Sequence, residues 1–139
     1  MAVRMKKKEK EEVVTKYINK NFYMFLQANE WLRLRQEGKT LIPFFEKNNY
    51  RNIAIYGLGD LGKRLVDELS LSDIKVIYCV DRKNDIIYKG LPVYSMNEKL
   101  PDVDAIIVTS DFYFDEIFEE LSTKVDCDIV NLDDIIFEI

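Results

Sequence analysis

Residues 52–69, "NIAIYGLGDLGKRLVDEL", decide the fold of this chain. The first five residues are mostly apolar and predict a strand, and leucines recur every four residues in the second half, which predicts a helix over 60–70. Between these segments, Gly57, Gly59 and Gly62 form the pattern G-x-G-x-x-G. A strand, a glycine turn and a helix in this order are typical of the first unit of a parallel α/β sheet.

The chain after residue 51 continues this alternation of strands and helices. The expected strands cover residues 52–56, 74–80, 91–94, 103–109 and 128–132. The fourth is apolar almost throughout, as a strand covered on both faces requires, and a helix over 111–121 follows it. We therefore expect an α/β fold, a Rossmann-like parallel sheet of about five strands with flanking helices.

A long helix is predicted to precede the sheet. No glycine or proline interrupts residues 7–36, and apolar side chains recur there at helical spacing, namely Val14, Ile18, Phe22, Phe25 and Leu32. Further apolar residues widen this face beyond what one small sheet can cover. A second copy of the chain is the natural cover, so we expect a homo-oligomer that forms through the N-terminal helix.

The connection between this helix and the sheet also has local signals. Gly38 can end the long helix, and Pro43 suits the first turn of a short helix within 41–49. We therefore divide the chain into an N-terminal helical segment, residues 1–50, and a Rossmann-like nucleotide-binding domain, residues 51–139.

The glycine loop is the predicted ligand-binding loop. In the dinucleotide-binding fingerprint, the first glycine allows a tight turn, the second lets backbone approach a pyrophosphate, and the third packs the helix on the sheet. The backbone N–H groups at the start of the helix then face an anion. The cofactor-binding residues expected here are Gly57, Leu58, Gly59, Asp60, Leu61 and Gly62.

Asp81 ends the second predicted strand, 24 residues after Gly57, where a carboxylate accepts the hydroxyls of an adenosine ribose. Such an acid favours NAD over NADP, although Arg82 and Lys83 beside it weaken that preference. An architectural interpretation stays open, because a glycine turn can be purely steric and an aspartate after a strand often caps a turn. Asp60 either caps its helix from outside the site or repels a dianionic ligand.

The end of the fourth strand supplies a second group of candidate residues. Thr109, Ser110 and Asp111 follow that strand, and ligands of open parallel sheets lie at the carboxyl ends of strands. Their alternative role is to cap the following helix. Phe112 and Tyr113 could cover a base or a sugar, and ordinary packing is the alternative for them.

Several kinds of catalysis are excluded by the residues that are missing. The chain has no histidine, so the commonest general base and metal ligand is absent; we expect no metal site and identify no catalytic residue. Neither a G-x-x-x-x-G-K-[ST] phosphate loop nor a Tyr-x-x-x-Lys pair occurs. The 139 residues leave no room for a separate substrate domain, which makes an enzyme the less favoured interpretation of the isolated chain.

Charge and hydropathy indicate a soluble, cytoplasmic protein. Residues 1–51 carry 12 basic against 6 acidic side chains, whereas residues 52–139 carry 8 against 19. Glutamates interleave with the lysines at the N-terminus and weaken their field, which argues against nucleic-acid binding. We expect no transmembrane segment or signal peptide, and we expect Cys79 and Cys127 to be buried free thiols.

Four stretches together carry a family resemblance, namely "IAIYGLGDLGKRLVDEL", "IKVIYCVDRK", "GLPVYSMNEKLPDVDAIIVTS" and "IVNLDDIIFEI". With them, residues 51–139 resemble the small Rossmann-like domains of bacterial surface-polysaccharide biosynthesis, those called nucleoside-diphosphate-sugar epimerase or dehydratase. They are also similar to the nucleotide-sugar-binding domain of sugar acyltransferases and to the CoA-binding and NADH-sensing Rossmann domains of redox repressors. The resemblance implies that Gly57, Gly59 and Gly62 contact phosphates and Asp81 the ribose.

The resemblance does not carry an activity with it. The catalytic histidine and hexapeptide repeats of the acyltransferases are missing, and a long helix stands where the repressors have a winged-helix domain. The first hypothesis is therefore a nucleotide-binding module for NAD(H) or a nucleotide sugar, accessory to surface-polysaccharide biosynthesis. The alternatives are a small NAD-dependent oxidoreductase or epimerase with a site completed by oligomerisation, and a ligand-free interaction scaffold.

Overall fold

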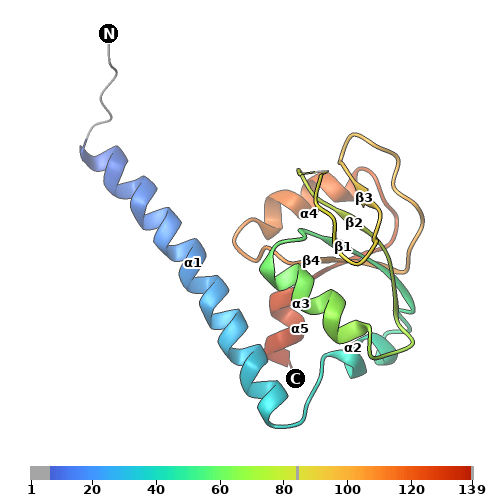
Figure 1. Ribbon diagram of the computed structural model, residues 1–139. Helices are drawn as coiled ribbons and strands as arrows, with labels where there is room; N and C mark the ends of the chain where they lie inside the picture. The colour runs from blue at the N-terminus through green and yellow to red at the C-terminus, as the bar shows by residue number, and fades with distance from the viewer. Residues whose placement is uncertain (1–6, 84, 139) are drawn as a thin grey trace.

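The computed structural model describes residues 7–83 and 85–138 and confirms the predicted α/β fold (Figure 1). A five-stranded, all-parallel sheet carries helices on both faces and follows a helix of 30 residues, α1. The strands are β1 (Asn52–Tyr56), β2 (Lys75–Val80), β3 (Val93–Tyr94), β4 (Ala105–Val108) and β5 (Asp128–Asn131). The helices are α1 (Lys7–Gln36), α2 (Ile42–Lys47), α3 (Asp60–Leu69), α4 (Phe114–Ser122) and α5 (Leu132–Glu138).

The strand order β3-β2-β1-β4-β5 places β1 at the centre of the sheet. From β1 the chain builds outward first through β2 and β3, and then returns to the other side of β1 with β4 and β5. The strand order therefore reverses between β1 and β4. Because all strands are parallel, their carboxyl ends share one edge, and the place where ligands bind in such sheets lies between the ends of β1 and β4.

The sheet is buried on both faces. In β1, Ile53 and Ile55 point into one core with apolar side chains of α1, α2, α3 and α5. Ala54 and Tyr56 point into the opposite core, which α4 covers. The same alternation in β4, where all four residues are buried, explains the nearly continuous apolar run in its sequence.

Several boundaries differ from the sequence expectation: β3 and β4 are shorter than the strands expected over 91–94 and 103–109, and two differences farther along the chain have a clear physical cause. Helix α4 begins at Phe114 and not at residue 111, because the carboxylate of Asp111 accepts a hydrogen bond from Asn131 Nδ2 (2.8 Å) and the chain makes a turn there. The last residues form the helix α5 where the sequence suggests a turn. Ile135 and Ile136 of α5 are fully buried, so packing against the core favours the helix.

One buried carboxylate fixes α1 and α2 to the rest of the molecule. Glu68 of α3 is 8% exposed and accepts hydrogen bonds from Trp31 Nε1 (3.1 Å) and from the backbone N–H of Leu41 (2.8 Å). Arg35 Nε lies 3.4 Å from the same carboxylate and supplies positive charge. One side chain of α3 thus holds both the end of α1 and the start of α2, although its partners lie more than 25 residues earlier in the sequence.

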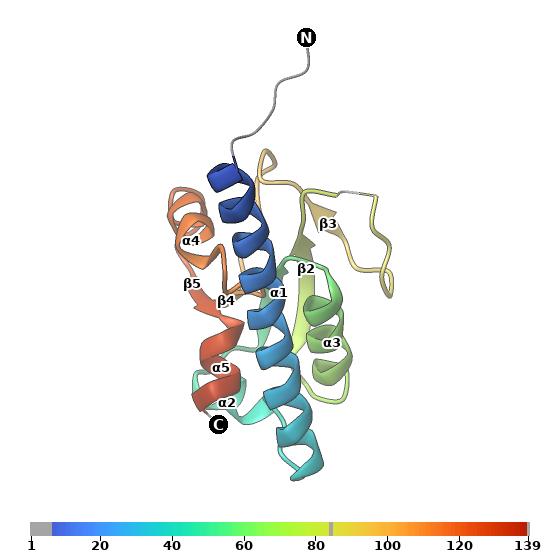
Figure 2. The ribbon, with the colours of Figure 1, turned by 90° about the vertical axis from the view of Figure 1, so that its left-hand side faces the viewer.

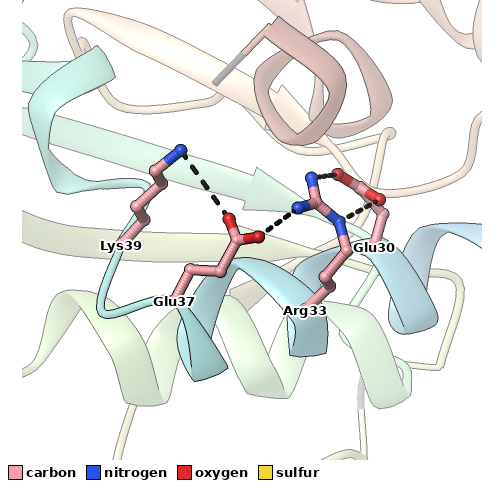
Figure 3. Close-up of polar contacts among 4 residues, drawn as sticks. All are labelled: Glu30, Arg33, Glu37 and Lys39. Carbon is pink, nitrogen blue, oxygen red and sulfur yellow. Dashed lines mark hydrogen bonds and ion pairs between the residues drawn. The ribbon is translucent and has the colours of Figure 1, made fainter.

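The end of α1 carries a second, exposed set of polar contacts (Figure 3). Arg33 pairs with Glu30 and, at 2.6 Å, with Glu37, whose other oxygen lies 3.7 Å from Lys39 Nζ. The hydrogen bond from Arg33 lowers the pKa of Glu30. Because these groups face solvent, screening keeps their contribution to stability small. No described helix, α1 included, is long and apolar enough to cross a membrane.

The two cysteines are free, as the sequence suggests, but they differ in burial. Cys79 is fully buried in β2, whereas Cys127 is partly exposed. Burial, followed by the negative charge of Asp81, raises the pKa of Cys79 to about 12. A thiol with such a pKa stays protonated near neutral pH and is a poor nucleophile.

Replacing Glu68 by alanine should lower the free energy of unfolding by about 3 kcal/mol, since two buried donors lose their acceptor at roughly 1–3 kcal/mol each. Urea denaturation measures this change. The matched control is Asp67→Ala, which removes an adjacent carboxylate whose partners are the largely exposed Lys89 and Arg64 and the half-buried hydroxyl of Tyr88; it should cost about 1 kcal/mol. Equal losses in the two variants would contradict the assigned role of Glu68.

The thiol of Cys79 should not react with a disulfide reagent at pH 8 while the protein is folded, because its pKa is raised to about 12. Cys127→Ser protein isolates this thiol. Absorbance should then show no labelling in buffer and one equivalent in denaturant. Rapid labelling of the folded protein would show that β2 opens at this position.

Candidate functional site

The glycine loop lies at the reversal of strand order, between the end of β1 and the start of α3. Gly57 follows β1 directly, and its N–H donates to the carbonyl of Val80 at the end of β2 (2.8 Å). Gly59 is the cap residue of α3, so the first unpaired N–H groups of that helix open toward the edge formed by the strand ends. The loop is thus placed where the sheet topology locates a ligand.

Two of the three glycines are required by the fold itself. Gly57 has φ +93°, and a Cβ there would lie 2.5 Å from Thr109 Oγ1. A Cβ on Gly62 would lie 2.1 Å from the carbonyl oxygen of Gly57. Both positions therefore exclude a side chain because of contacts within the chain, in agreement with the turn and packing roles of the fingerprint.

Gly59 is different. Its φ is −84°, which any residue adopts, and a Cβ there would meet no atom within 4 Å. The backbone of Gly59 is exposed on the outside of the loop. Among the described residues, nothing in the chain itself requires a glycine at this position, which is the one that approaches a pyrophosphate in the fingerprint.

Thr109 holds the loop through its side-chain hydroxyl. Its hydroxyl lies 3.0 Å from the carbonyl oxygen of Tyr56 and 2.9 Å from that of Gly57, and it can donate its single proton to either. The side chain is 9% exposed. Thr109 therefore fixes the conformation of the turn, and the neighbouring Ser110 is the residue of this segment that faces the open space.

Asp81 holds the glycine loop against the end of β2. Its Oδ2 accepts the N–H of Leu58 (2.8 Å), and its Oδ1 accepts the N–H of Lys83 (2.9 Å). The carboxylate thus acts as a turn cap, one of the alternatives that the sequence leaves open. A carboxylate has about four acceptor positions, so two backbone donors leave capacity for ligand hydroxyls.

The remaining residues of the predicted loop do not all face the site. Leu58 and Leu61 are buried in the apolar core between the sheet and α3, and only the backbone N–H of Leu58 points toward Asp81. Asp60 is exposed in the first turn of α3, where the positive end of the helix dipole favours a carboxylate.

A crevice of about 450 Å³ opens beside the loop at the carboxyl edge of the sheet. It brings together four of the residues expected from sequence, Gly57, Asp81, Arg82 and Ser110. The full lining comprises Lys20, Tyr56, Gly57, Asp81, Arg82, Lys83, Ser110, Tyr113, Glu116 and Ile117. Its volume is within the range of small-molecule sites.

Helix α1 adds cations to this crevice that the sequence analysis missed. Lys20 Nζ lies 5.2 Å from the centroid of the Tyr113 ring, and Lys16 Nζ lies 5.9 Å and 5.8 Å from the rings of Phe112 and Tyr113. The two rings pack edge to face at 4.9 Å. The four-residue spacing of the lysines shows that they share a helix face, but only the fold shows that this face lies over the crevice.

The charges around the crevice are mixed and leave a surplus of cations. Lys20, Arg82 and Lys83 are basic, against the carboxylates of Asp81 and Glu116. Tyr56 adds a phenol whose pKa is raised, first by burial and then by the negative charge of Glu120. Such a phenol stays neutral and can donate a hydrogen bond at neutral pH. Within residues 7–83 and 85–138, no three metal-ligating side chains cluster together.

A larger hollow, of about 520 Å³, lies on another side of the molecule between α1 and α3. Its walls are largely apolar, with Trp31, Leu32 and Leu71 among them, and Leu61 is the one predicted loop residue that reaches it. Because it lies away from the strand ends and shares no crevice residue, we place the candidate site in the smaller crevice.

Comparison with known proteins supports the domain but names no ligand. Residues 49–130, more than half of the chain, match the family model described as C2185-like, N-terminal. The match begins just before β1 and ends within β5, so it covers the glycine loop and the carboxyl ends of β1 to β4. No curated protein matches the chain, and no solved structure matches it either.

The three glycines should respond differently to substitution. Gly62→Ala should lower the free energy of unfolding by about 2 kcal/mol, because the new Cβ collides with the carbonyl of Gly57. Gly59→Asn should change it by no more than about 1 kcal/mol, since the space is open and asparagine is a favoured helix cap. Urea denaturation measures both. A large loss from Gly59→Asn would show that the loop, and not a ligand, needs this glycine.

Proposed function

Since the chain belongs to the C2185-like, N-terminal family, whose name specifies no ligand, we propose from the site itself that this protein is a nucleotide-binding module. The ligand is NAD(H) or a nucleotide sugar. Its diphosphate lies on the glycine loop at the start of α3, and the nucleoside occupies the crevice beside it.

Gly59 is the observation that carries this proposal. Gly57 and Gly62 are explained by contacts within the chain, whereas Gly59 has open space around it and an ordinary φ. Close approach of a ligand to the backbone is a physical reason for glycine at such a position. Free N–H groups at the start of the ten-residue helix α3 favour a diphosphate there.

The cations and aromatic rings of the crevice suit the same ligand. Lys20 of α1 and Arg82, just after β2, both line the crevice and can balance the charge of two phosphates. The exposed part of the Tyr113 ring offers a surface on which a base or a sugar can stack.

In this proposal Asp81 accepts the hydroxyls of the ribose, as the sequence predicts. Its two hydrogen bonds to Leu58 and Lys83 fix the carboxylate at the mouth of the crevice without using all of its acceptor positions. A negative charge held there disfavours a 2′-phosphate, and Arg82 and Lys83 oppose that effect. We therefore place NAD(H) ahead of NADP(H) as the dinucleotide.

We infer a binding role in preference to catalysis. The carboxylate best placed in the crevice, Asp81, already accepts two backbone N–H groups and so serves to hold the loop. Tyr56 has a raised pKa, so its phenol stays protonated at neutral pH and is not available as a general base. The family resemblance of the motifs supports an accessory role in surface-polysaccharide biosynthesis in the cytoplasm.

A ligand screen by thermal unfolding tests the proposal. The melting temperature is measured with NAD, NADH, NADP, CoA, UDP-sugars and dTDP-sugars, on protein shown to be free of copurified nucleotide. A ligand present at a hundred times its dissociation constant should stabilise the fold by about 2.7 kcal/mol, a shift of several degrees. No shift with any of these compounds would overturn the nucleotide proposal and favour the ligand-free scaffold.

Three variants then locate the bound nucleotide. Gly59→Asn should keep the melting temperature of the free protein and abolish the shift, because a side chain occupies the phosphate position. Lys20→Ala should weaken binding by about tenfold, as expected for the loss of one charged contact of roughly 1–2 kcal/mol. Lys124→Ala, an exposed lysine just after the C-terminal end of α4 and outside the crevice lining, is the matched control and should leave the shift unchanged. Retained binding in Gly59→Asn would place the ligand elsewhere.

A further inference from the structure

The outer side of α1 carries an uncovered apolar stripe. Four of its side chains, Ile18, Phe22, Phe25 and Leu32, are each between 54 and 61% exposed. They come from one continuous helix, and Figure 2 shows α1 in front of the rest of the molecule with its outer side free. Leu32, at the edge of this side, also lines the rim of the hollow between α1 and α3. We call these four residues and Asn29, which lies among them, the outer stripe. Large exposed apolar patches on a monomer mark interaction sites.

The stripe cannot be covered by the domain to which α1 belongs. At 3.6 residues per turn, nine residues make about two and a half turns, so residues nine apart lie on opposite sides of a helix. Gln27 lies nine residues after Ile18, and Leu34 lies nine residues after Phe25. Gln27 and Leu34 are 1% and 0% exposed, respectively, so α1 packs on its own domain through the side opposite the stripe.

The spacing along the stripe is that of a helix pair. The positions 18, 22, 25, 29 and 32 are separated by four, three, four and three residues, which is the alternation of the d and a positions of a heptad. Ile18, Phe25 and Leu32 occupy d positions, and Phe22 and Asn29 occupy a positions. A helix that only covered a sheet would not need this pattern on its solvent side.

We propose that two copies of this chain pair in parallel through the outer stripe of α1. Asn29 is the reason for the parallel arrangement. A single asparagine at an a position faces the same residue of the partner helix in a parallel pair, where the two amides can hydrogen-bond. In an antiparallel pair with the same packing layers, Asn29 would face the apolar Ile18 of the other copy. The pairing does not depend on which ligand occupies the crevice.

The charges beside the stripe favour a second copy over a lipid surface. Helices that lie on membranes flank their apolar side with lysines and arginines. Here the neighbours of the stripe in the N-terminal half are the uncharged Asn19 and Asn21, while Lys16 and Lys20 lie on the opposite side, over aromatic rings of the domain.

The arginines near the other end of the stripe do not oppose pairing. Arg33 is bound by Glu30 and Glu37 of its own helix, and Arg35 lies 3.4 Å from Glu68. Figure 3 shows the Glu30–Arg33–Glu37 contacts along one side of α1. Because each arginine has a carboxylate partner within the same chain, two copies can approach without unbalanced repulsion.

Sedimentation over micromolar to millimolar concentrations tests the pairing. The wild-type chain should form a dimer, and Phe25→Asp should weaken it at least about a hundredfold, because each dimer loses two buried rings. The matched control, Phe118→Asp, replaces a ring that is 43% exposed on α4 and should leave the dimer unchanged. Circular dichroism verifies that the variants fold, as expected for residues exposed in the monomer.

A wild-type chain that stays monomeric at every concentration would overturn the proposal, as would a dimer that Phe25→Asp leaves intact. Vesicles of neutral and anionic lipid serve as the competing probe. A monomer that binds them through the stripe would overturn pairing in favour of a lipid surface.

Cross-linking tests the direction of the pair. In Cys127→Ser protein, Asn29→Cys should form a disulfide-linked dimer on mild oxidation, because facing a positions lie within disulfide range. In the antiparallel alternative, the two sulfur-bearing residues would lie about 16 Å apart along the axis, given a rise of 1.5 Å per residue. Glu30→Cys, one residue further along, is the control and should not cross-link. A dimer in which Asn29→Cys fails to cross-link would overturn the parallel arrangement.

Discussion

The arrangement of α1 against the sheet depends on the buried carboxylate of Glu68. A charge in this position loses solvation, and such a group is tolerated only where donors and opposite charge surround it. Trp31, Leu41 and Arg35 provide these partners, and they belong to α1 and to the segment that enters α2. Since α3 begins at the glycine loop, Glu68 connects the position of α1 to the position of that loop. The lysine at position 20 consequently reaches the crevice, and the apolar stripe consequently faces away from the domain.

The glycines of the loop fall into two kinds: those that contacts within the chain require, and one that such contacts do not explain. The turn at Gly57 and the close packing at Gly62 are demanded by neighbouring atoms of the same chain, so any protein with this strand and helix would need them. Thr109 and Asp81 then hold the loop in one conformation with their side chains. A loop stabilised in this way is preorganised, and a ligand would not have to supply the free energy of ordering it. The open space around Gly59 is the part of the motif that the fold leaves without an internal explanation.

Much of this architecture could be predicted from the sequence because its signals are local. The apolar run of β4, the glycine turn and the uninterrupted helix over 7–36 each follow from periodicity or from a single residue type, and the structure confirms them. The helix α5 was not predicted, because its acidic first turn resembles a turn in sequence. What stabilises the helix is the tertiary packing of Ile135 and Ile136. Of the residues that line the crevice, the site prediction included only those at the carboxyl edge of the sheet. Lys20 is separated from the loop by more than 35 residues, and no local pattern states which element a helix face will meet. The ligand and the oligomer stay predictions.

The single tryptophan of the chain lies at the junction held by Glu68, where it is 6% exposed and donates its indole N–H to the carboxylate. The protein therefore carries one indole fluorophore beside its eight tyrosines, and this indole lies where the long helix meets the domain. Indole emission depends on local polarity and on hydrogen bonding, so the spectrum of Trp31 reports on this junction and on no other part of the fold. A change that separates α1 from α3 while leaving the sheet intact would alter that emission before it alters the circular dichroism of the sheet, which distinguishes movement of the helix from unfolding of the molecule.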